Sequence, residues 1–230
     1  MDETVVPQRA TTADAVVVSV DWLFEPAWRG DRLVARLAEG SISLTDAAGV
    51  PAGDAFGEVL DVLSGAILAD AAVIDGVWTA MPFIGDGSPA RAWADTIASE
   101  GLADELPDPL ETERRRAFVA VDLVELDGEP LYEVPLQERR RLLESVIQEG
   151  VQVRLSPIVK QPISGWLVGW RENGFTHYLA KHMNSRYAPG TVCSDWLEIS
   201  VNSSAPRGFM TRMLGSGMTN PRSRRVPDRR

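Results

Sequence analysis

Apolar positions along this chain recur at two spacings, every second residue for a strand and every third or fourth for a helix. The clearest strand signal covers 117–126, where β-branched and apolar residues end at the turn Asp127-Gly128. Two shorter apolar runs on either side of Glu39-Gly40 predict a hairpin. The predicted strands are 15–24, 33–37, 42–44, 71–80, 117–126, 151–155, 177–182 and 196–201.

Helical spacing is found in four further segments. Phe56, Val59, Leu60 and Leu63 recur at intervals of three and four, and Pro135 opens a run of good helix formers. The predicted helices are 56–63, 91–102, 135–143 and 163–170. Because strands and helices do not alternate strictly, the pattern predicts an α+β fold with substantial antiparallel sheet.

The two ends of the chain differ from this central pattern. Residues 1–14 are mostly polar, and we expect them to form a flexible N-terminus. Residues 205–230 combine Pro, Gly, Ser and Arg with little apolar periodicity, which predicts a disordered tail. One folded body remains at 15–204, and a length of 230 residues suits one ordinary domain or two small ones.

Charge is distributed unevenly along the chain. The formal net charge is −10, yet residues 205–230 hold seven arginines and a single acid. An acidic body would repel a DNA backbone, whereas the basic tail could contact phosphates or simply be solvated. Only Lys160 and Lys181 are lysines, which restricts where a lysine-dependent reaction could occur.

The remaining composition favours a cytoplasmic protein. Hydrophobic residues make up 44% and charged residues 24%, as in soluble globular proteins. The single cysteine, Cys193, cannot form an internal disulfide, which suits a reducing compartment and predicts an inert thiol. No apolar run approaches the roughly 18 residues of a membrane span, and acids at Asp2 and Glu3 replace the basic start of a signal peptide. We therefore expect no membrane partner.

Five segments, taken in their order and spacing, resemble the catalytic domain of ATP-dependent DNA ligases, a nucleotidyltransferase (adenylation) domain. They are 24–32, 73–76, 122–128, 135–143 and 174–197. The resemblance implies two antiparallel sheets with flanking helices around an ATP cleft. The residues after Trp196 are too few for the OB-fold domain that usually follows in the family, so we expect none.

The resemblance also implies a chemistry. In the family a lysine attacks the α-phosphate of ATP and becomes adenylated, AMP passes to a DNA 5′-phosphate, and a 3′-hydroxyl displaces it. This chemistry requires an amine nucleophile, carboxylates beside a divalent metal, and lysines that stabilise charge on phosphoryl oxygens. An aromatic ring stacks on the adenine. ATP and Mg²⁺ are thus the cofactors to expect if the activity survives.

The chain departs from the family at the positions that carry this chemistry. The opening motif Glu-x-Lys-x-Asp-Gly-x-Arg lacks its lysine and its aspartate, and the final motif Trp-Leu-Lys-x-Lys lacks both lysines. The changed positions are Ala27 (lysine in the family), Arg29 (aspartate), Val77 (glutamate of Asp-Gly-Glu), Val121 (aromatic ring), Thr176 and His177 (Glu-Gly), and Glu198 and Ser200 (lysines). Glu25, Arg32, Asp75 and Lys181 keep the family residue types and are the candidate remnants of the nucleotide site.

We therefore predict no catalytic residue, no metal site and no cofactor. The chain is interpreted as a DNA ligase-like pseudoenzyme that has lost adenylation and has a binding or accessory role with an unidentified protein partner or ligand. One alternative is a functional ATP-dependent DNA ligase or nucleotidyltransferase in DNA repair with altered chemistry. Another is a DNA-binding accessory protein that uses the arginine-rich tail.

Two groups of polar residues are interpreted as structural. His177 and His182 are five apart on a predicted strand, so they lie on opposite faces and form no metal pair. The basic run 139–141 belongs to a predicted helix and is expected to form a solvated face.

The tryptophans are interpreted mainly as core residues. Trp166 and Trp170 are four apart on one helix face, which predicts core packing. Trp22 and Trp28 flank the former ATP site, where core filling is expected and stacking on a different ligand is the alternative.

Overall fold

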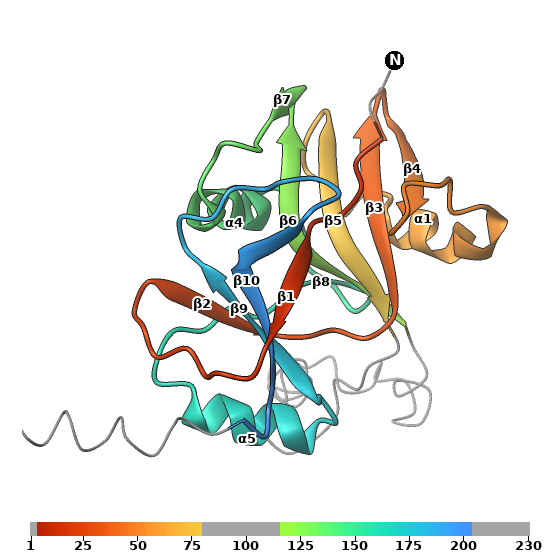
Figure 1. Cartoon of the computed structure of the whole chain (residues 1–230). Coiled ribbons are helices and arrows are strands. Elements are labelled where there is room, and N and C mark those ends of the chain that lie inside the picture. The colour runs from red at the N-terminus through yellow and green to blue at the C-terminus, as the bar shows by residue number, and fades with distance from the viewer. Residues whose placement is uncertain (1–3, 80–115, 204–230) are drawn as a thin grey trace, which may run out of the picture.

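A computed structural model describes residues 4–79 and 116–203, and these form two β-sheets that face each other (Figure 1). Sheet A has the strand order β1-β10-β9-β2, and sheet B has the order β4-β3-β5-β6-β7, with β8 pairing parallel to β6. Sheet A comprises β1 (Arg9–Ala13), β10 (Val192–Ser200), β9 (His177–His182) and β2 (Trp22–Pro26). Sheet B comprises β4 (Ser41–Asp46), β3 (Asp31–Ala38), β5 (Ala72–Thr79), β6 (Ala117–Leu126), β7 (Glu129–Pro130) and β8 (Val153–Leu155).

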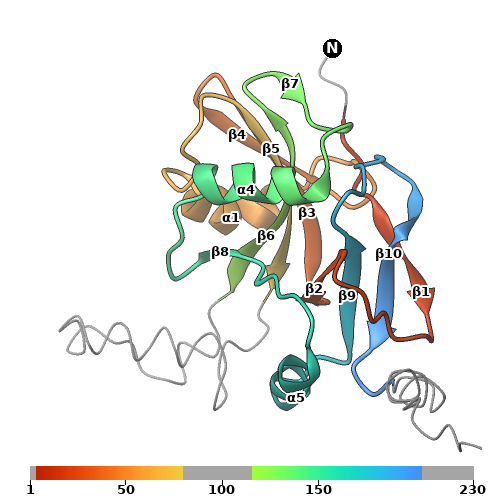
Figure 2. The same cartoon turned by 90° about the vertical axis from the view of Figure 1, so that its left-hand side faces the viewer.

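Helices α1 (Gly57–Leu63) and α4 (Leu136–Val146) lie against the outer face of sheet B, and α5 (Ser164–Glu172), at the bottom of the view in Figure 2, packs against sheet A. The 3₁₀ turn η1 (Asp54–Phe56) precedes α1. Because neighbouring strand residues point to opposite faces, Ile74 of β5 packs with α1 and α4, whereas Val73 packs toward sheet A. On the outer face of sheet A, Phe24 and Tyr178 pack with Trp170 of α5. The prediction of an α+β fold with antiparallel sheet is confirmed.

The predicted N-terminal flexibility is wrong for residues 4–13. β1 pairs in parallel with β10, and Val5 and Gln8 before it are only 4% and 2% exposed. The predicted strand 15–24 is also displaced, because the strand that pairs with β9 is Trp22–Pro26. Val18 and Val20 lie outside it and are exposed. A polar segment with a partner strand thus forms a strand, and a β-branched segment without one does not.

Several other predictions are settled by these elements, and some are not tested. The hairpin around Glu39-Gly40 is formed by β3 and β4, and β6 and β9 have their predicted bounds. Gly76 does not interrupt its strand, although the register of β5 against β6 shifts beside it. The predicted helix 91–102 and the predicted disordered tail 205–230 lie outside the described residues. No helix within the described residues is long and apolar enough to cross a membrane.

Candidate functional site

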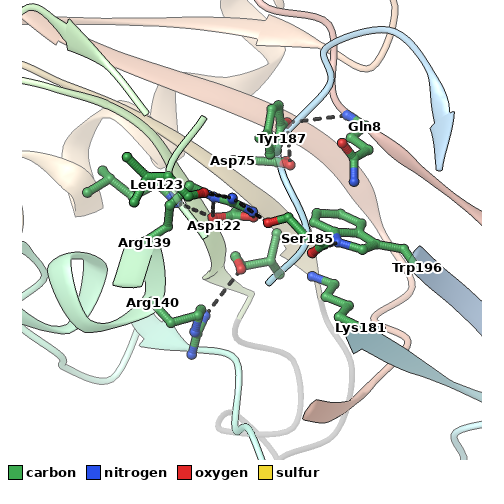
Figure 3. A network of polar contacts seen from close by, with 12 residues as sticks. Gln8, Asp75, Asp122, Leu123, Arg139, Arg140, Lys181, Ser185, Tyr187 and Trp196 are labelled. Carbon is green, nitrogen blue, oxygen red and sulfur yellow. Dashed lines mark hydrogen bonds and ion pairs between the residues drawn. The ribbon is translucent and has the colours of Figure 1, made fainter. Parts of the chain in front are cut away.

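Strand pairing decides which side chains lie between the two sheets. In β9, Lys181 is directly opposite Leu23 of β2 and Trp196 of β10, so the three share one face of sheet A. Leu23 and Trp196 pack against Val73 of β5, and Asp75, two residues further along β5, points to the same side. Asp75 and Lys181, two of the candidate remnants, therefore lie between the two sheets (Figure 3).

A fully buried ion pair anchors α4 to sheet B in this region. Arg139 donates from Nε to Asp122 Oδ1 at 2.9 Å and from Nη2 to Asp122 Oδ2 at 2.8 Å. Its Nη1 donates to the carbonyl oxygens of Val134 and Ser185. Arg140 is buried as well and donates to the carbonyl oxygen of Ser156 at 2.7 Å. The predicted solvated face at 139–141 is wrong for these two arginines, because both guanidiniums bind carbonyl groups of the body.

A second ion pair joins the neighbouring strands β3 and β5. Arg32 donates to both carboxylate oxygens of the buried Asp75, at 2.5 and 2.6 Å, and Tyr187 donates its hydroxyl to the same carboxylate at 2.8 Å. The Tyr187 oxygen accepts the backbone N–H of Gln8 at 3.3 Å. Burial, reinforced by the Asp75 charge, raises the pKa of Tyr187 well above its usual value. The phenol therefore acts as a fixed hydrogen-bond donor at neutral pH.

The third ion pair lies within sheet A. Lys181 is 1% exposed, and its ammonium pairs with the buried carboxylate of Glu25 on β2. The same ammonium lies 3.9 Å from the ring centre of Trp196, a cation–π distance. Trp196 is in turn fixed by a hydrogen bond from its Nε1 to Ser185 Oγ at 3.0 Å. The positive charge of Lys181 is thus already engaged by groups of its own chain.

The segment after β2 holds the residue that stands at the nucleophile position. Ala27 donates its backbone N–H to the carbonyl oxygen of His177 at 3.1 Å and offers only a methyl side chain. The adjacent Trp28 donates its indole N–H to Ser156 Oγ at 2.9 Å, and its ring meets Phe175 edge to face at 5.1 Å. The prediction of core packing by Trp28 agrees with these contacts. Trp22 is also partly buried, and its ring meets His182 edge to face.

Two positions that hold acids in the family now contact each other. Arg29 donates from Nη2 to Thr176 Oγ1, and the same oxygen lies 2.9 Å from Nδ1 of His177. A guanidinium thus occupies the position where the resemblance places a carboxylate. Gly30 follows at φ 151°, and a Cβ there would lie 2.2 Å from the carbonyl oxygen of Trp78. This close approach explains why the glycine is kept although its charged neighbour has changed.

The remaining changed positions lie in the same region. Val77 and Val121 are buried. Glu198 and Ser200 are half-buried and follow Trp196 at intervals of two, so they share its face of β10. Lys160 lies beside β2, since Val159 pairs with Phe24, but its side chain is exposed.

The residues present do not fit ATP and Mg²⁺ as the family uses them. Within 4–79 and 116–203, no group of three or more His, Cys, Asp or Glu residues could hold a metal ion. Asp75 is occupied by Arg32 and Tyr187, and Glu25 is occupied by Lys181. The buried carboxylates of Asp75 and Glu25 are therefore paired with cations of the same chain.

Comparison with known proteins identifies relatives of this chain by sequence. No family model matches the chain. The DNA ligase of Thermococcus onnurineus is 26% identical over 153 residues, which is 62% of this chain and 25% of the ligase. The multifunctional non-homologous end joining DNA repair protein LigD of Mycobacterium tuberculosis is 25% identical over 177 residues, which is 77% of this chain and 21% of LigD. The chain thus spans about a quarter of the length of the curated relatives it matches.

Solved structures agree with the sequence relatives. The ligase domain of M. tuberculosis LigD matches with a TM-score of 0.61 and 23% identity, covering 84% of this chain and 58% of that domain. A mycobacterial DNA ligase D complexed with ATP and MES matches with a TM-score of 0.63 and 24% identity, covering 85% of this chain and 60% of that one. The chain has the fold of a DNA ligase catalytic domain. The resemblance drawn from the motifs is confirmed.

The ligase fold brings together the candidate residues that the motifs singled out. All four remnants lie on strands of the two facing sheets. They form two ion pairs, Lys181 with Glu25 and Arg32 with Asp75. Of the changed positions, Arg29 and Thr176 meet directly. In the structure, Lys181 and Arg32 are each paired with a carboxylate of the chain.

Several residues of the site were not recognised as such from sequence. Gln8 falls in the segment that composition predicts to be flexible, and Arg139 falls in the run predicted to be a solvated helix face. Tyr187 and Ser185 belong to a family segment but have no predicted role. Arg139 carried a usable signal, because an arginine that continues the apolar face of a helix next to Leu136 and Leu143 is expected to point inward. Gln8 carried none.

Proposed function

We propose that this chain is a catalytically inactive DNA ligase-like protein that no longer forms a lysyl adenylate and has a binding or accessory role. The observation that carries the proposal is Ala27, which directly follows β2 and offers only a methyl group where the family chemistry needs an amine. A nucleotidyl transfer through a covalent intermediate has no first step without a nucleophile.

No described residue offers a good substitute for that nucleophile. Lys181 is held by Glu25 and by the Trp196 ring, and Lys160 is exposed beside β2. Arg29 is close to the position, but a guanidinium stays protonated and is a poor nucleophile. The loss at Ala27 is therefore not compensated by a neighbouring lysine.

The charges around Ala27 also oppose binding of a metal-bound triphosphate. A cation stands at Arg29 in place of a carboxylate, and Glu198 stands in place of a lysine. Each change inverts a favourable interaction with Mg²⁺ or with phosphate oxygens. Together with the neutral Val77 and Thr176, they support loss of the whole function and not of one step.

One observation favours the alternative of a working nucleotidyltransferase with altered chemistry. Glu25, Arg32, Asp75 and Lys181 persist, and a structural neighbour is a ligase complexed with ATP. The DNA-binding accessory role through 205–230 stays a prediction from charge, as does the cytoplasmic location. An unidentified protein partner or ligand remains the expected binding target.

Intact-mass spectrometry after incubation with ATP and MgCl₂ separates the two main possibilities. We expect the mass of the unmodified chain, while the mycobacterial LigD ligase domain run in parallel gains one AMP. The Ala27→Lys variant is also expected to remain unmodified, because Val77, Thr176 and Glu198 still leave metal and phosphate without partners. An AMP adduct on the natural chain would refute the proposal, and an adduct on the variant alone would show that only the nucleophile was lost.

A further inference from the structure

Helix α5 presents an apolar surface to solvent that the body does not cover. Trp166 is 44% exposed and Val168 is 47% exposed, whereas Ile163, Leu167 and Trp170 hold the helix onto sheet A. The prediction that both Trp166 and Trp170 pack in the core is therefore wrong for Trp166, which only flanks the buried face. Tryptophan exposed beside other apolar residues is typical of contact sites.

Two glycines on the solvent side of α5 leave room for a second segment to approach the helix backbone. Gly165 and Gly169 lie one turn apart, and a Cβ added to either would meet nothing within 4 Å. At 3.6 residues per turn, Val168, the two glycines and Trp166 follow one another around the exposed half of the helix. We call the surface strip of Gly165 and Gly169 the Gly165–Gly169 lane. Each glycine costs the helix about 1 kcal/mol relative to alanine, so close contact with a second segment explains the lane better than helix stability does.

The described chain leaves the body next to this helix. Arg171 of α5 donates from Nη2 to the carbonyl oxygen of Val201 at 2.9 Å, and Ser203 is the last described residue. Although residues 205–230 as a whole show little apolar periodicity, one short stretch six residues further on is an exception. It holds Phe209, Met210, Met213 and Leu214 at the spacing of one helix face. Six residues reach about 20 Å, while the nine residues of α5 are about 13 Å long.

We propose that the segment 208–214 of the same chain docks its apolar residues on the exposed face of α5, over Trp166 and the Gly165–Gly169 lane. A short tether favours this occupant, because it keeps the segment at an effective concentration near the millimolar range. The docked segment contains Arg212 and is directly preceded by Arg207. The other five arginines of the tail, at 222–230, stay available for another role. The proposal does not depend on loss of adenylation.

Limited trypsin digestion of the full chain tests the docking by comparing two bonds of one tail. Cleavage after Arg212 reports on the docked segment, and cleavage after Arg225 serves as the internal reference. The decisive variant is Gly169→Gln, which fills the lane and improves the helix propensity of α5, so a loss of protection cannot come from unfolding. We expect the ratio of cleavage after Arg212 to cleavage after Arg225 to rise about tenfold in this variant, equal to about 1.4 kcal/mol.

Three further variants complete the test. Phe209→Ser is expected to raise the same ratio, and the double variant with Gly169→Gln is expected to raise it no further, since both remove one contact. Val50→Ser, an exposed valine beyond β4, is the matched control and should leave the ratio unchanged. Equal ratios in the natural chain and Gly169→Gln would overturn the proposal. Protection that rises with protein concentration would also overturn it, because the occupant would then be a second copy.

Discussion

At the scale of single residues, the buried charged side chains between the sheets are paired with one another. Lys181 and Arg32, which the ligase resemblance places at a nucleotide site, are paired with Glu25 and Asp75. Asp122 and Arg139 pair with each other in the same way, Asp122 also accepts the backbone N–H of Leu123, and Arg139 also donates to carbonyl oxygens. Charges compensated in this way stabilise a fold only while both partners are present.

This dependence predicts opposite outcomes for two neighbouring arginines of α4. Arg139→Met leaves the fully buried Asp122 carboxylate without its partner, and we expect a loss of about 3–5 kcal/mol in the free energy of unfolding. Arg141→Met removes an exposed guanidinium that pairs with Glu138 one turn away, and should change stability little. Urea denaturation followed by far-UV circular dichroism measures both. A small effect of Arg139→Met would mean that the buried ion pair does not anchor α4.

At the scale of elements, pairing partners decided where local pattern succeeded or failed. β6 and β9 match their predicted bounds, and each lies inside a sheet with a paired strand on both sides. β1 was missed because a polar edge strand is fixed by its parallel neighbour β10, which no local pattern reveals. The site was partly predictable for a similar reason. The family motifs located Lys181 and Asp75, but the carboxylate that meets each cation depends on strand register, which only the fold supplies.

The N-terminal segment gives a prediction in which local pattern and structure disagree. Val5 lies in the segment predicted to be flexible but packs between the sheets, so Val5→Ala should cost about 1–2 kcal/mol. Val18 lies in the predicted strand but is 49% exposed, so Val18→Ala should stay within about 0.5 kcal/mol. Thermal unfolding of the two variants under identical conditions gives the comparison. The reverse order would show that residues 4–8 are not part of the packed body.

At the scale of the whole molecule, the two packed layers on either side of sheet A differ in their side chains. The layer between the sheets holds the ion pairs, while the layer between sheet A and α5 holds aromatic rings, among them Tyr178 against Trp170 at 5.9 Å. Tyr187 in the first layer donates to Asp75, whereas the hydroxyl of Tyr178 has no hydrogen-bond partner among the described residues. Both phenols are buried, although only Tyr187 has a hydrogen-bond partner, so the stability of the fold depends on pH in the alkaline range.

From the raised pKa values of these two tyrosines, we predict that the free energy of unfolding falls at alkaline pH. Burial raises the pKa of Tyr178 from 10 to about 12 and that of Tyr187 well above 10. Below pH 10 both states keep the proton and the contribution is fully present. Above pH 10 the unfolded chain ionises first, so stability is lost as pH rises toward the folded pKa, by at most about 1.4 kcal/mol per pH unit for each group.

Phenylalanine variants separate the two tyrosines. Tyr178→Phe removes a buried hydroxyl without a partner, so it should be neutral or stabilising at pH 8 and should flatten the decline between pH 10 and 12. Tyr187→Phe loses the bond to Asp75 and is expected to be about 1.5–3 kcal/mol less stable below pH 10. This difference should narrow above pH 10, because the variant lacks the Tyr187 part of the decline. Urea midpoints measured from pH 8 to 12 test both expectations. If Tyr178→Phe keeps the natural chain's slope between pH 10 and 12, the Tyr178 phenol is not buried in the folded state.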